Sequence, residues 1–444
     1  VQVLVSAAGS CALPGLGLHF YNWDGLKTCM PASFVNPSSE AEVSKYLKET
    51  EGPVKVVGGG LSFSGIQLTD DGGHMLSLDR MNKILDVKHL PDADSGEALV
   101  TVQAGIRLRE LAEKLDALGL AMPNMGATAQ QSFAGAAATG THGTGQRLGG
   151  IASQVVALRL VTADGTIVSA NANENAALFR AAKTGLGALG VLTTVTLRTI
   201  PQWKMKLEQY PQSLESLLEE LPSLLSQHPR LQWSWTPYTD NATVVIRTDV
   251  PWDTPISPAA DRENTGCWVE GSMPNPCTDL SYKTLTDSAY HYAKRTIYTE
   301  MEMFVPEQRS VEAVRAFIAW MDSPEVRAQR NPAVQISAMV RYVAADDILL
   351  SPMQGRATAV LSFIAVQAEG STQQFELFAS GLQSLCEAKF QGRPHWGKVS
   401  YVDANTRTYL ASAYVGMRDF LQQARASDPQ GRFSNSFLKD RIGL

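Results

Sequence analysis

Residues 126–145, GATAQQSFAGAAATGTHGTG, constrain what this chain can fold into more than any other stretch. Nearly every residue there is Gly, Ala, Ser or Thr, and none is acidic. Side chains this small cannot fill a core, but they let backbone amides approach another surface, with hydroxyls between them to donate hydrogen bonds. The pattern indicates a backbone cradle for a pyrophosphate or a flat ring system. A Gly/Ala-rich loop or tightly packed helix start without a ligand is the alternative.

Two further glycine-rich stretches favour the ligand interpretation. Residues 55–65, KVVGGGLSFSG, run from a short apolar strand into three glycines and two serines. This stretch lacks the lysine of a Walker loop and the spacing of a GxGxxG fingerprint, so alone it is a weak signal. Residues 184–201, TGLGALGVLTTVTLRTIP, place three glycines before a β-branched strand. Several such loops in one domain favour a dinucleotide bound between them.

Length, charge and cysteine usage narrow the class. The chain has 444 residues, enough for two domains, and a net charge of −6 without a basic block, which argues against nucleic acid as a partner. No apolar run reaches the ~18 residues that a membrane-spanning helix needs. Five cysteines without metal-ligand spacing favour an intracellular, reducing compartment or mostly free thiols. A Cys267–Cys277 disulfide in a secreted protein is the alternative.

The order of predicted elements indicates an α+β fold. Ser39 and Glu42 have capping-box spacing at a helix start, a leucine stripe predicts a helix over residues 107–118, and residues 408–425 predict one amphipathic helix. Strands and helices before Pro201 do not alternate as a βαβ series, which disfavours a doubly wound dinucleotide fold. A change in composition at Pro201 predicts a second α+β domain after it.

A short C-terminal motif contains side chains that are common in active sites. Residues 393–398, RPHWGK, place a cation, an imidazole and an indole beside a Pro and a Gly that fix the backbone. Taken alone, His395 is more often a structural histidine and Trp396 more often a core residue.

Taken together, these motifs resemble the aldonolactone oxidase and alditol oxidase branch of the vanillyl-alcohol-oxidase-type flavoproteins. The resemblance spans residues ~20–440 and rests on four separated places in the family's order. They are GGGLSFSG, then the 126–145 stretch with QVVALRLVTADG, then TGLGALGVLTTVTL, and finally RPHWGK with DPQGRFSN. The resemblance implies an FAD-binding domain of two α+β subdomains over residues 1–201, an α+β substrate (cap) domain over 202–390, and a segment 391–444 that returns to the flavin.

The resemblance also assigns residues to the cofactor. Those implied to hold FAD are Val56, Val57, Gly58, Gly59, Gly60, Leu61 and Ser62 at the pyrophosphate, Gly126, Ala127, Ser132, Gly135, Thr139, Gly140, Thr141 and His142 along the cofactor, and Val191 at its adenine side. His395 and Lys398 would meet the isoalloxazine as catalytic residues, where Lys398 would stabilise the negative charge of the reduced ring.

The reaction that the resemblance implies is oxidation of a CH–OH group by hydride transfer to flavin N5. Arg341, on the strand within residues 334–352, would orient substrate oxygen and stabilise developing alkoxide. An ion pair of Arg341 with Asp346 or Asp347 is the alternative.

Two departures from the family bear on the cofactor and the electron acceptor. Leu61 stands where the family's covalent enzymes carry the linking histidine, and no cysteine lies between Cys29 and Cys267, so FAD is expected to be non-covalent. Gly126 stands where plant galactonolactone dehydrogenases carry an alanine that blocks oxygen. The glycine favours an oxidase that reduces O2 to H2O2.

Further departures concern the substrate wall. Met339 replaces the family's glutamate two residues before Arg341, so that strand lacks a carboxylate for sugar hydroxyls. Ser362 and Ile364 stand where alditol oxidases have His and Thr. The expected substrate is a sugar-derived lactone, a polyol or a related small alcohol. A dehydrogenase that passes electrons to cytochrome c or quinone, and a non-catalytic flavin-binding protein, are the alternatives.

Overall fold

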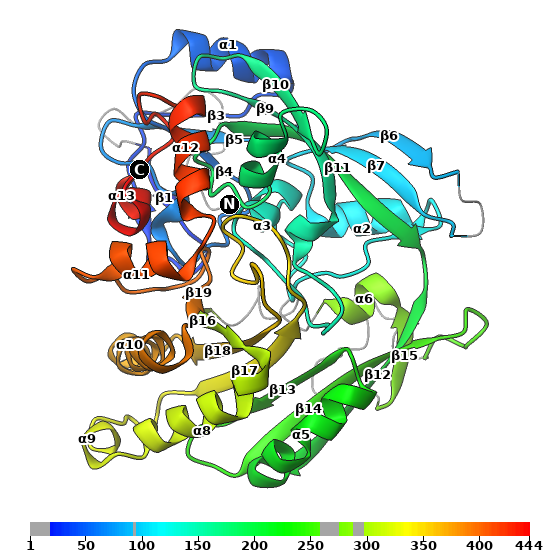
Figure 1. Cartoon of the computed structure of the whole chain (residues 1–444), viewed down its shortest axis with the longest axis vertical. Coiled ribbons are helices and arrows are strands. Elements are labelled where there is room, and N and C mark those ends of the chain that lie inside the picture. The colour runs from blue at the N-terminus through cyan, green and yellow to red at the C-terminus, as the bar shows by residue number, and fades with distance from the viewer. Residues whose placement is uncertain (1–17, 92–94, 258–274, 287–296) are drawn as a thin grey trace.

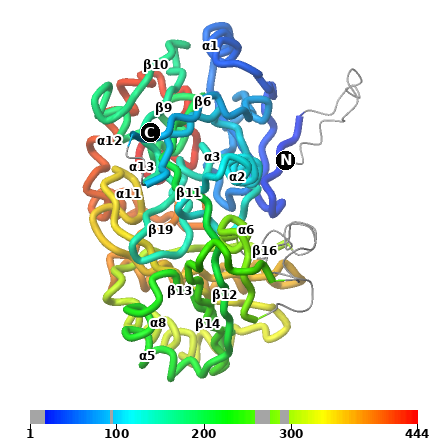
Figure 2. The backbone as a smooth tube through the Cα atoms, turned by 90° about the vertical axis from the view of Figure 1, so that its right-hand side faces the viewer, coloured from blue at the N-terminus to red at the C-terminus, as the bar shows by residue number. Residues whose placement is uncertain are grey.

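The computed structural model describes residues 18–91, 95–257, 275–286 and 297–444. Its described strands form four sheets, which lie in two halves of the molecule (Figure 1). Figure 2 shows the same division from the side, with β6, β9 and the C-terminal helices in one half and β12–β14 in the other. The fold combines helices with mixed sheets, which confirms the predicted α+β class.

The first half contains three of the sheets. A two-stranded sheet pairs β1 (Phe20–Tyr21) with β2 (Thr28–Cys29), and a parallel sheet has the order β3-β5-β4. A six-stranded sheet has the order β10-β9-β11-β7-β6, with β8 paired to β11. Strand bounds are β3 Ser33–Val35, β4 Val54–Val57, β5 His74–Ser77, β6 Ile84–His89, β7 Ala98–Gln103, β8 Leu120–Ala121, β9 Val155–Val161, β10 Ile167–Asn171 and β11 Val191–Pro201.

Helices of this half follow the predicted signals closely. In α1 (Glu40–Glu49), Ser39 is the N-cap, and its hydroxyl accepts a hydrogen bond from the Glu42 amide at 3.2 Å. The leucine stripe of α2 (Leu108–Asp116) is buried. Two shorter helices of this half are α3 (Phe133–Ala138) and α4 (Ala176–Ala182). Within the 126–145 stretch, α3 begins after Ser132, whose hydroxyl accepts from the Gly135 amide at 3.3 Å.

The second half is built on one eight-stranded sheet of order β15-β12-β14-β13-β17-β18-β16-β19. Strand bounds are β12 Lys204–Ser213, β13 Leu231–Trp235, β14 Asn241–Val250, β15 Cys277–Leu280, β16 Tyr298–Pro306, β17 Ile336–Val343, β18 Thr358–Val366 and β19 Arg393–Pro394. One face of this sheet, including Trp233 and Trp235, packs into a core with α5 (Leu214–Gln227), α8 (Ser310–Met321) and α10 (Ser371–Phe390). These helices lie on the side away from the first half (Figure 1). The short helices α6 (Ser281–Leu285) and α9 (Pro324–Arg327) complete it.

The small-residue stretch of the first half meets the large sheet at the end of β17 and the start of β13. The Gly145 amide donates to the Tyr342 carbonyl at 2.6 Å, and the Thr144 hydroxyl donates to the Leu231 carbonyl at 2.6 Å. The 126–145 stretch therefore runs along the junction between the two halves.

The predicted helix over residues 408–425 is wrong. Two helices, α11 (Thr406–Ala413) and α12 (Met417–Ser427), replace it, with a break at Tyr414–Gly416. A Cβ on Gly416 would lie 2.6 Å from the Leu349 carbonyl oxygen, so the backbone at the break is pressed against a neighbouring loop. This tertiary contact overrides the helical periodicity.

The chain ends in α13 (Ser436–Ile442), which ties the C-terminal segment to the first half. The Asn435 side-chain amide donates to the carbonyls of Gly65, Ile66 and Leu68, and Lys55 Nζ donates to the Phe433 carbonyl at 2.8 Å. Arg432 donates to four backbone carbonyls between Leu47 and Ala163. The DPQGRFSN motif is thus a structural clamp.

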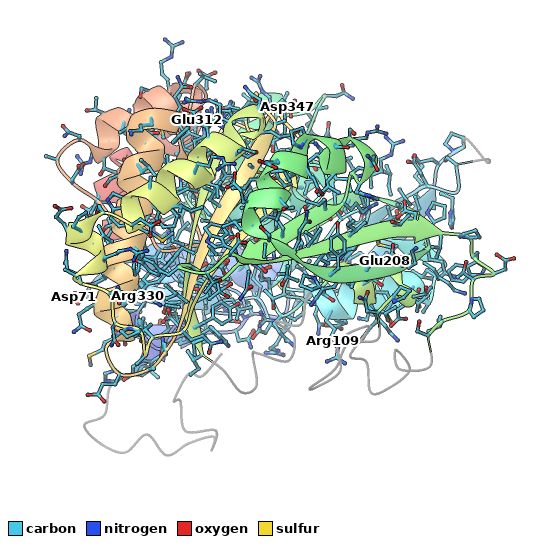
Figure 3. The ribbon with its side chains drawn as sticks, turned by 90° about the horizontal axis from the view of Figure 1, so that it is seen from below. Asp71, Arg109, Glu208, Glu312, Arg330 and Asp347 are labelled. Carbon is cyan, nitrogen blue, oxygen red and sulfur yellow. The ribbon has the colours of Figure 1, made fainter. Side chains whose placement is uncertain are left out.

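Surface and cysteine features bear on the expected environment. Exposed acids and bases, Glu312 and Arg330 among them, lie on the surface of the molecule (Figure 3). None of the described helices is both long and apolar enough to cross a membrane. Cys29 and Cys386 are free, whereas Cys277 is disulfide-bonded, a departure from the expectation of mostly free thiols. Cys267, the alternative partner considered, lies outside the described residues.

Candidate active site

A cavity in the first half lies between the predicted glycine-rich loops. Its walls come from β4 and the turn after it, from α3 with the residues before it, and from the turn before β11. The glycines there are required by close packing: a Cβ on Gly58 would lie 2.1 Å from Ser132 Oγ, and one on Gly59 would lie 2.8 Å from an Arg107 guanidinium nitrogen. The first two loops therefore touch, as a two-sided cradle for a dinucleotide requires.

The cavity suits an FAD-sized ligand on this chain's own chemistry. Its lining is mainly backbone and small side chains, with apolar walls for a ring system. Gln131 contributes a buried side-chain oxygen that has no hydrogen-bond partner among the described residues. That oxygen faces Gly126 behind the cavity, where a Cβ would lie 3.7 Å from it, so the fit of the ligand rests on the small-residue lining and not on this atom.

Most of the predicted cofactor residues line this cavity, and several do not. Those that line it are Val56, Val57, Gly58, Gly59, Gly60, Leu61, Ser62, Ser132, Gly135 and Thr139. Val191 is fully buried in a core beside Val161, and its neighbours Gly190 and Leu192 line the cavity instead. Gly126, Ala127, Gly140, Thr141 and His142 are absent from the lining. Gly126 packs behind it, where a Cβ would lie 2.8 Å from Thr141 Cγ2.

The RPHWGK segment joins this cavity to the large sheet. The Gly397 carbonyl accepts from the Phe63 amide at 2.8 Å, and the Trp396 carbonyl accepts from the Ser64 hydroxyl at 2.8 Å. A Cβ on Gly397 would lie 3.4 Å from both Ser62 Oγ and Thr139 Oγ1, one from each cofactor loop. The segment also runs along the edge of β16, since the His395 and Val399 amides donate to the Glu302 and Glu300 carbonyls. His395 and Lys398 are therefore held at the junction.

Two glutamates on β16 form the centre of the polar site, and sequence analysis missed both. Glu300 and Glu302 are buried, with relative exposures of 4% and 2%, in the strand YTEMEMFVP. At period-two spacing they share one face, while Met301 and Met303 point into the core on the other. Ionised carboxylates this deeply buried need cations or hydrogen-bond donors. The sequence did contain a sign of them, because two acids alternate with apolar methionines in the strand YTEMEMFVP.

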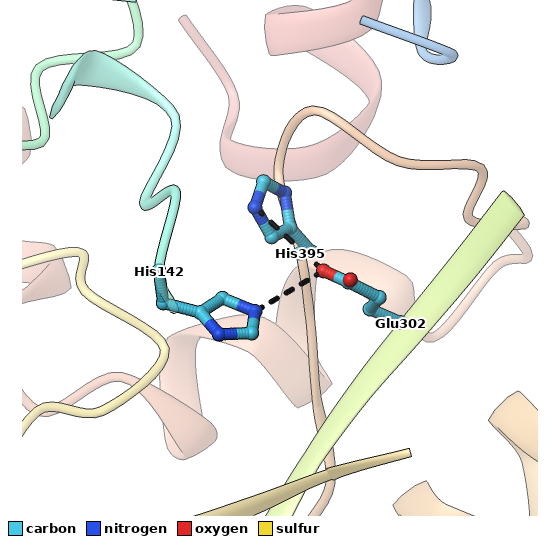
Figure 4. Close-up of side chains that lie close together, drawn as sticks. All are labelled: His142, Glu302 and His395. Carbon is cyan, nitrogen blue, oxygen red and sulfur yellow. Dashed lines mark hydrogen bonds and ion pairs between the residues drawn. The ribbon is translucent and has the colours of Figure 1, made fainter. Parts of the chain in front are cut away.

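Glu302 accepts contacts from four side chains. Oε1 faces Ser362 Oγ at 3.2 Å and Lys398 Nζ at 3.8 Å, and Oε2 faces the Nε2 atoms of His142 at 3.3 Å and of His395 at 3.8 Å (Figure 4). Burial acts to raise the pKa of Glu302, but the charges of Lys398 and His142 outweigh burial and hold the pKa well below its usual range. Glu302 is therefore a fixed anion.

The two histidines differ in their hydrogen-bond roles. His395 Nδ1 accepts from the Gly397 amide at 2.9 Å, so the neutral ring carries its proton on Nε2, toward Glu302. Burial lowers the pKa of His395 to about 3. His142 Nδ1 lies 2.9 Å from the Gly143 carbonyl, which can only accept. Both His142 nitrogens therefore face acceptor oxygens, one on the Gly143 backbone and one on Glu302.

His142, Glu302 and His395 also lie close enough to be considered as a metal centre, since their ligand atoms fall within 4.8 Å of one another. A metal at His395 Nε2 would need the lone pair there, and the hydrogen bond from Gly397 places a proton on that nitrogen instead. The ammonium of Lys398 adds a competing positive charge 3.8 Å from Glu302. The three side chains are therefore better suited to hydrogen bonding around the Glu302 carboxylate than to binding a metal cation.

Lys398 and Arg341 lie near Glu300. Lys398 Nζ is ion-paired with Glu300 Oε2, and despite burial the two glutamates raise the pKa of Lys398. Burial raises the pKa of Glu300, with the charges of Lys398 and Arg341 acting against it. Asp346, the alternative partner for Arg341, accepts from the Ser351 hydroxyl and the Ile348 amide. Neither Lys398 nor Arg341 lines the dinucleotide cavity.

The predicted substrate residues share this face of the sheet. Ser362 lies opposite Met339 on one side and opposite Glu302 on the other, and Ile364 lies opposite Glu300. Met339 and Ile364 are half-buried, whereas Arg341 and Ser362 are buried. The strand carrying Met339 lacks a carboxylate, as predicted, but the wall as a whole contains two.

Comparisons with known proteins agree with this geometry. A family described as "FAD binding domain" matches residues 31–171, and one described as "D-arabinono-1,4-lactone oxidase" matches residues 274–441. The L-gulonolactone oxidase of Mus musculus is 30% identical over 95% of this chain and 98% of its own length. Two further relatives cover the same shares of the two chains: an L-gulono-1,4-lactone dehydrogenase of Mycobacterium tuberculosis, 31% identical, and an alditol oxidase of a Streptomyces species, 30% identical.

A solved cholesterol oxidase from B. sterolicum superposes with a TM-score of 0.77 at 15% identity, covering 96% of each chain, so it shares the fold. Fold and site together define an FAD-dependent oxidoreductase. The chain belongs to the aldonolactone oxidase and alditol oxidase branch of the vanillyl-alcohol-oxidase-type flavoproteins.

Proposed function

We propose that this chain is an oxidase of the CH–OH group of a sugar-derived lactone, a polyol or a related alcohol, with non-covalent FAD and O2 as the acceptor. The observation that carries the proposal is a buried, charged wall of the large sheet that meets a dinucleotide cradle at the RPHWGK segment. Relatives named L-gulonolactone oxidase and alditol oxidase support this substrate class.

The cofactor side of the proposal rests on the two touching loops. Residues 56–62 and the start of α3 would hold the pyrophosphate and ring through backbone amides and hydroxyls. When bound, FAD supplies an acceptor for hydride and passes the electrons to O2. Leu61 lines the cavity and offers no nucleophile for a covalent link.

The substrate side rests on the polar face of β16, β17 and β18. Arg341 would orient a substrate oxygen and stabilise negative charge as the C–H bond breaks. Glu302, Ser362 and Lys398 offer fixed acceptors and donors of the kind that hydroxyls or a lactone carbonyl pair with. Half-buried Met339 and Ile364 would contribute apolar contact beside them.

A peroxide-release screen over aldonolactones, polyols and simpler alcohols tests the proposal. An oxidase produces H2O2 in step with substrate loss and bleaches its flavin under anaerobic conditions. Turnover with an artificial dye but without peroxide would move the assignment to a dehydrogenase. A flavin that no member of the panel bleaches would support the non-catalytic alternative.

A further inference from the structure

The oxidation of an alcohol releases a proton as well as a hydride, and the site must contain a group that takes it. The candidates near the substrate wall are His142, His395, Glu302, Glu300 and Lys398. A group can accept the proton only if its hydrogen bonds leave a lone pair free, and each candidate is judged by this criterion.

Neither histidine has a ring nitrogen left free to take the proton from the substrate. His395 uses Nδ1 to accept from Gly397 and carries hydrogen on Nε2, and both nitrogens of His142 face acceptor oxygens. His395 was predicted as a catalytic residue, but its protonated Nε2 lies 3.8 Å from Glu302 Oε2 and its Nδ1 is already used, so it faces Glu302 and does not act as a base. His142 acts on the same carboxylate from the cofactor side (Figure 4).

Glu302 and Lys398 are also poor proton acceptors. The oxygens of Glu302 already face the Lys398 ammonium, the Ser362 hydroxyl and the ring nitrogens of His142 and His395, and protonation would disrupt this arrangement. Lys398 lies between two carboxylates, which favour its charged form, and an ammonium has no lone pair.

Glu300 differs from all of these. Its Oε2 is paired with Lys398, whereas its Oε1 has no hydrogen-bond partner among the described residues and is not sealed from solvent. It shares the polar face with Glu302, and the residue opposite it, Ile364, is half-buried. The charged or titratable groups that face it are Lys398 from the C-terminal segment, Arg341 from β17, and Glu302 and Tyr298 from its own strand.

We propose that Glu300 is the catalytic residue that accepts the hydroxyl proton of the substrate. The O–H bond breaks with its proton passing to Glu300 Oε1, the C–H bond breaks with its electron pair passing as hydride to the flavin, and a C=O bond forms. Lys398 and Glu302 carry opposite charges that balance each other beside Glu300, whether Glu300 is ionised or protonated. This assignment rests on the proposed alcohol oxidation, and burial of Glu300 supports it by raising the proton affinity of a carboxylate.

The test compares Glu300→Gln with Glu302→Gln in the FAD-loaded protein, using anaerobic flavin bleaching across pH. In the wild type the rate should fall as the pH falls through the raised pKa of Glu300, because only the carboxylate accepts a proton. Glu300→Gln should lose this acidic limb and bleach about 10²–10⁴-fold more slowly, with FAD affinity by fluorescence within about threefold. Glu300→Asp should restore the limb.

Glu302→Gln provides the matched control, because it removes an equally buried carboxylate on the same face. It should keep the acidic limb and move it to lower pH, since loss of a nearby negative charge lowers the pKa of Glu300. Bleaching by Glu300→Gln within threefold of the wild type, or an acidic limb that persists in it, overturns the proposal.

A second readout is independent of substrate. Infrared titration of the FAD-loaded protein should show a carboxylic-acid band that grows as pH falls, that Glu300→Gln removes and that Glu302→Gln retains. Retention of the band in Glu300→Gln overturns the proposal. If no alcohol or lactone bleaches the wild type, the proposed function fails, and the infrared band still decides whether Glu300 takes up a proton.

Discussion

Glu302 and Met339 lie in one row of the eight-stranded sheet, two strands apart, each directly opposite Ser362. The carboxylate that the Met339 position lacks is therefore present in the same row, delivered by β16 instead of β17. A wall that is apolar at one end of this row and anionic at the other would favour an alcohol with hydroxyls toward β16. The row therefore has an apolar end at Met339 and an anionic end at Glu302, which would orient a bound substrate.

The first prediction concerns cofactor attachment. Because Leu61 replaces a linking histidine and lines the cavity, acid precipitation should release essentially all flavin into the supernatant. The visible spectrum of the supernatant against that of the pellet measures this. Yellow colour that stays with the pellet would contradict a non-covalent cofactor.

The second prediction concerns oxygen. Gly126→Ala should slow reoxidation of the reduced enzyme by O2 and leave anaerobic reduction nearly intact, as measured by stopped-flow absorbance. The new Cβ would lie 2.8 Å from Thr141 Cγ2 and 3.3 Å from the His142 carbonyl oxygen, so it also presses on the neighbouring backbone segment.

A double variant separates these two effects of Gly126→Ala. Thr141→Ser removes Cγ2 and keeps the hydroxyl that accepts from Gln131. Reoxidation should remain slow in Gly126→Ala/Thr141→Ser if the methyl group blocks oxygen. Recovery of the wild-type rate in the double variant would trace the effect to the clash with Thr141 Cγ2.

The third prediction separates the two cations. Arg341→Met should keep FAD content and flavin potential while lowering kcat/KM about a hundredfold or more, since a charge-assisted hydrogen bond in the transition state contributes ~2–4 kcal/mol. Lys398→Met should lower the flavin potential and slow reduction for every substrate. It should also lower the melting temperature, because Glu300 and Glu302 lose the cation between them. Near-normal turnover of Arg341→Met would remove β17 from the substrate wall.

The fourth prediction concerns substrate preference. Met339→Glu should raise kcat/KM for polyhydroxylated substrates relative to simple alcohols, because it adds an acceptor opposite Ser362. Met339→Gln, of similar shape without the charge, is the matched control and should give a smaller change. An unchanged ranking of substrates in both variants would place Met339 away from the substrate.

Much of the cofactor side could be predicted because its signals are local. Glycine turns such as Gly58–Gly60 are visible in the sequence because close backbone approach excludes side chains, and the Ser39–Glu42 spacing fixes a helix start. The break at Gly416 could not be predicted, because it depends on a loop carbonyl brought from Leu349 by the tertiary fold.

The polar site was predicted only in part, for a related reason. His395 and Arg341 were found through motifs, but their partners are Glu302 and Glu300 on a strand without a motif. Pairing of β16 with the RPHWGK segment joins residues nearly a hundred positions apart. No local pattern encodes that register, although two acids in a core strand were a sign that cations must reach them.

The contacts of Arg432 and Asn435 with the N-terminal half determine when the cofactor loop can reach its final structure during synthesis. The glycine turn after β4 is synthesised early. The Asn435 amide donates to the carbonyls of Gly65, Ile66 and Leu68 just after this turn, and the Phe433 carbonyl accepts from Lys55. Both Phe433 and Asn435 are made some 370 residues later. The nascent chain must therefore carry an unfinished cofactor loop through almost its whole synthesis. The contacts that hold this loop in place can form only when almost the whole chain has been made.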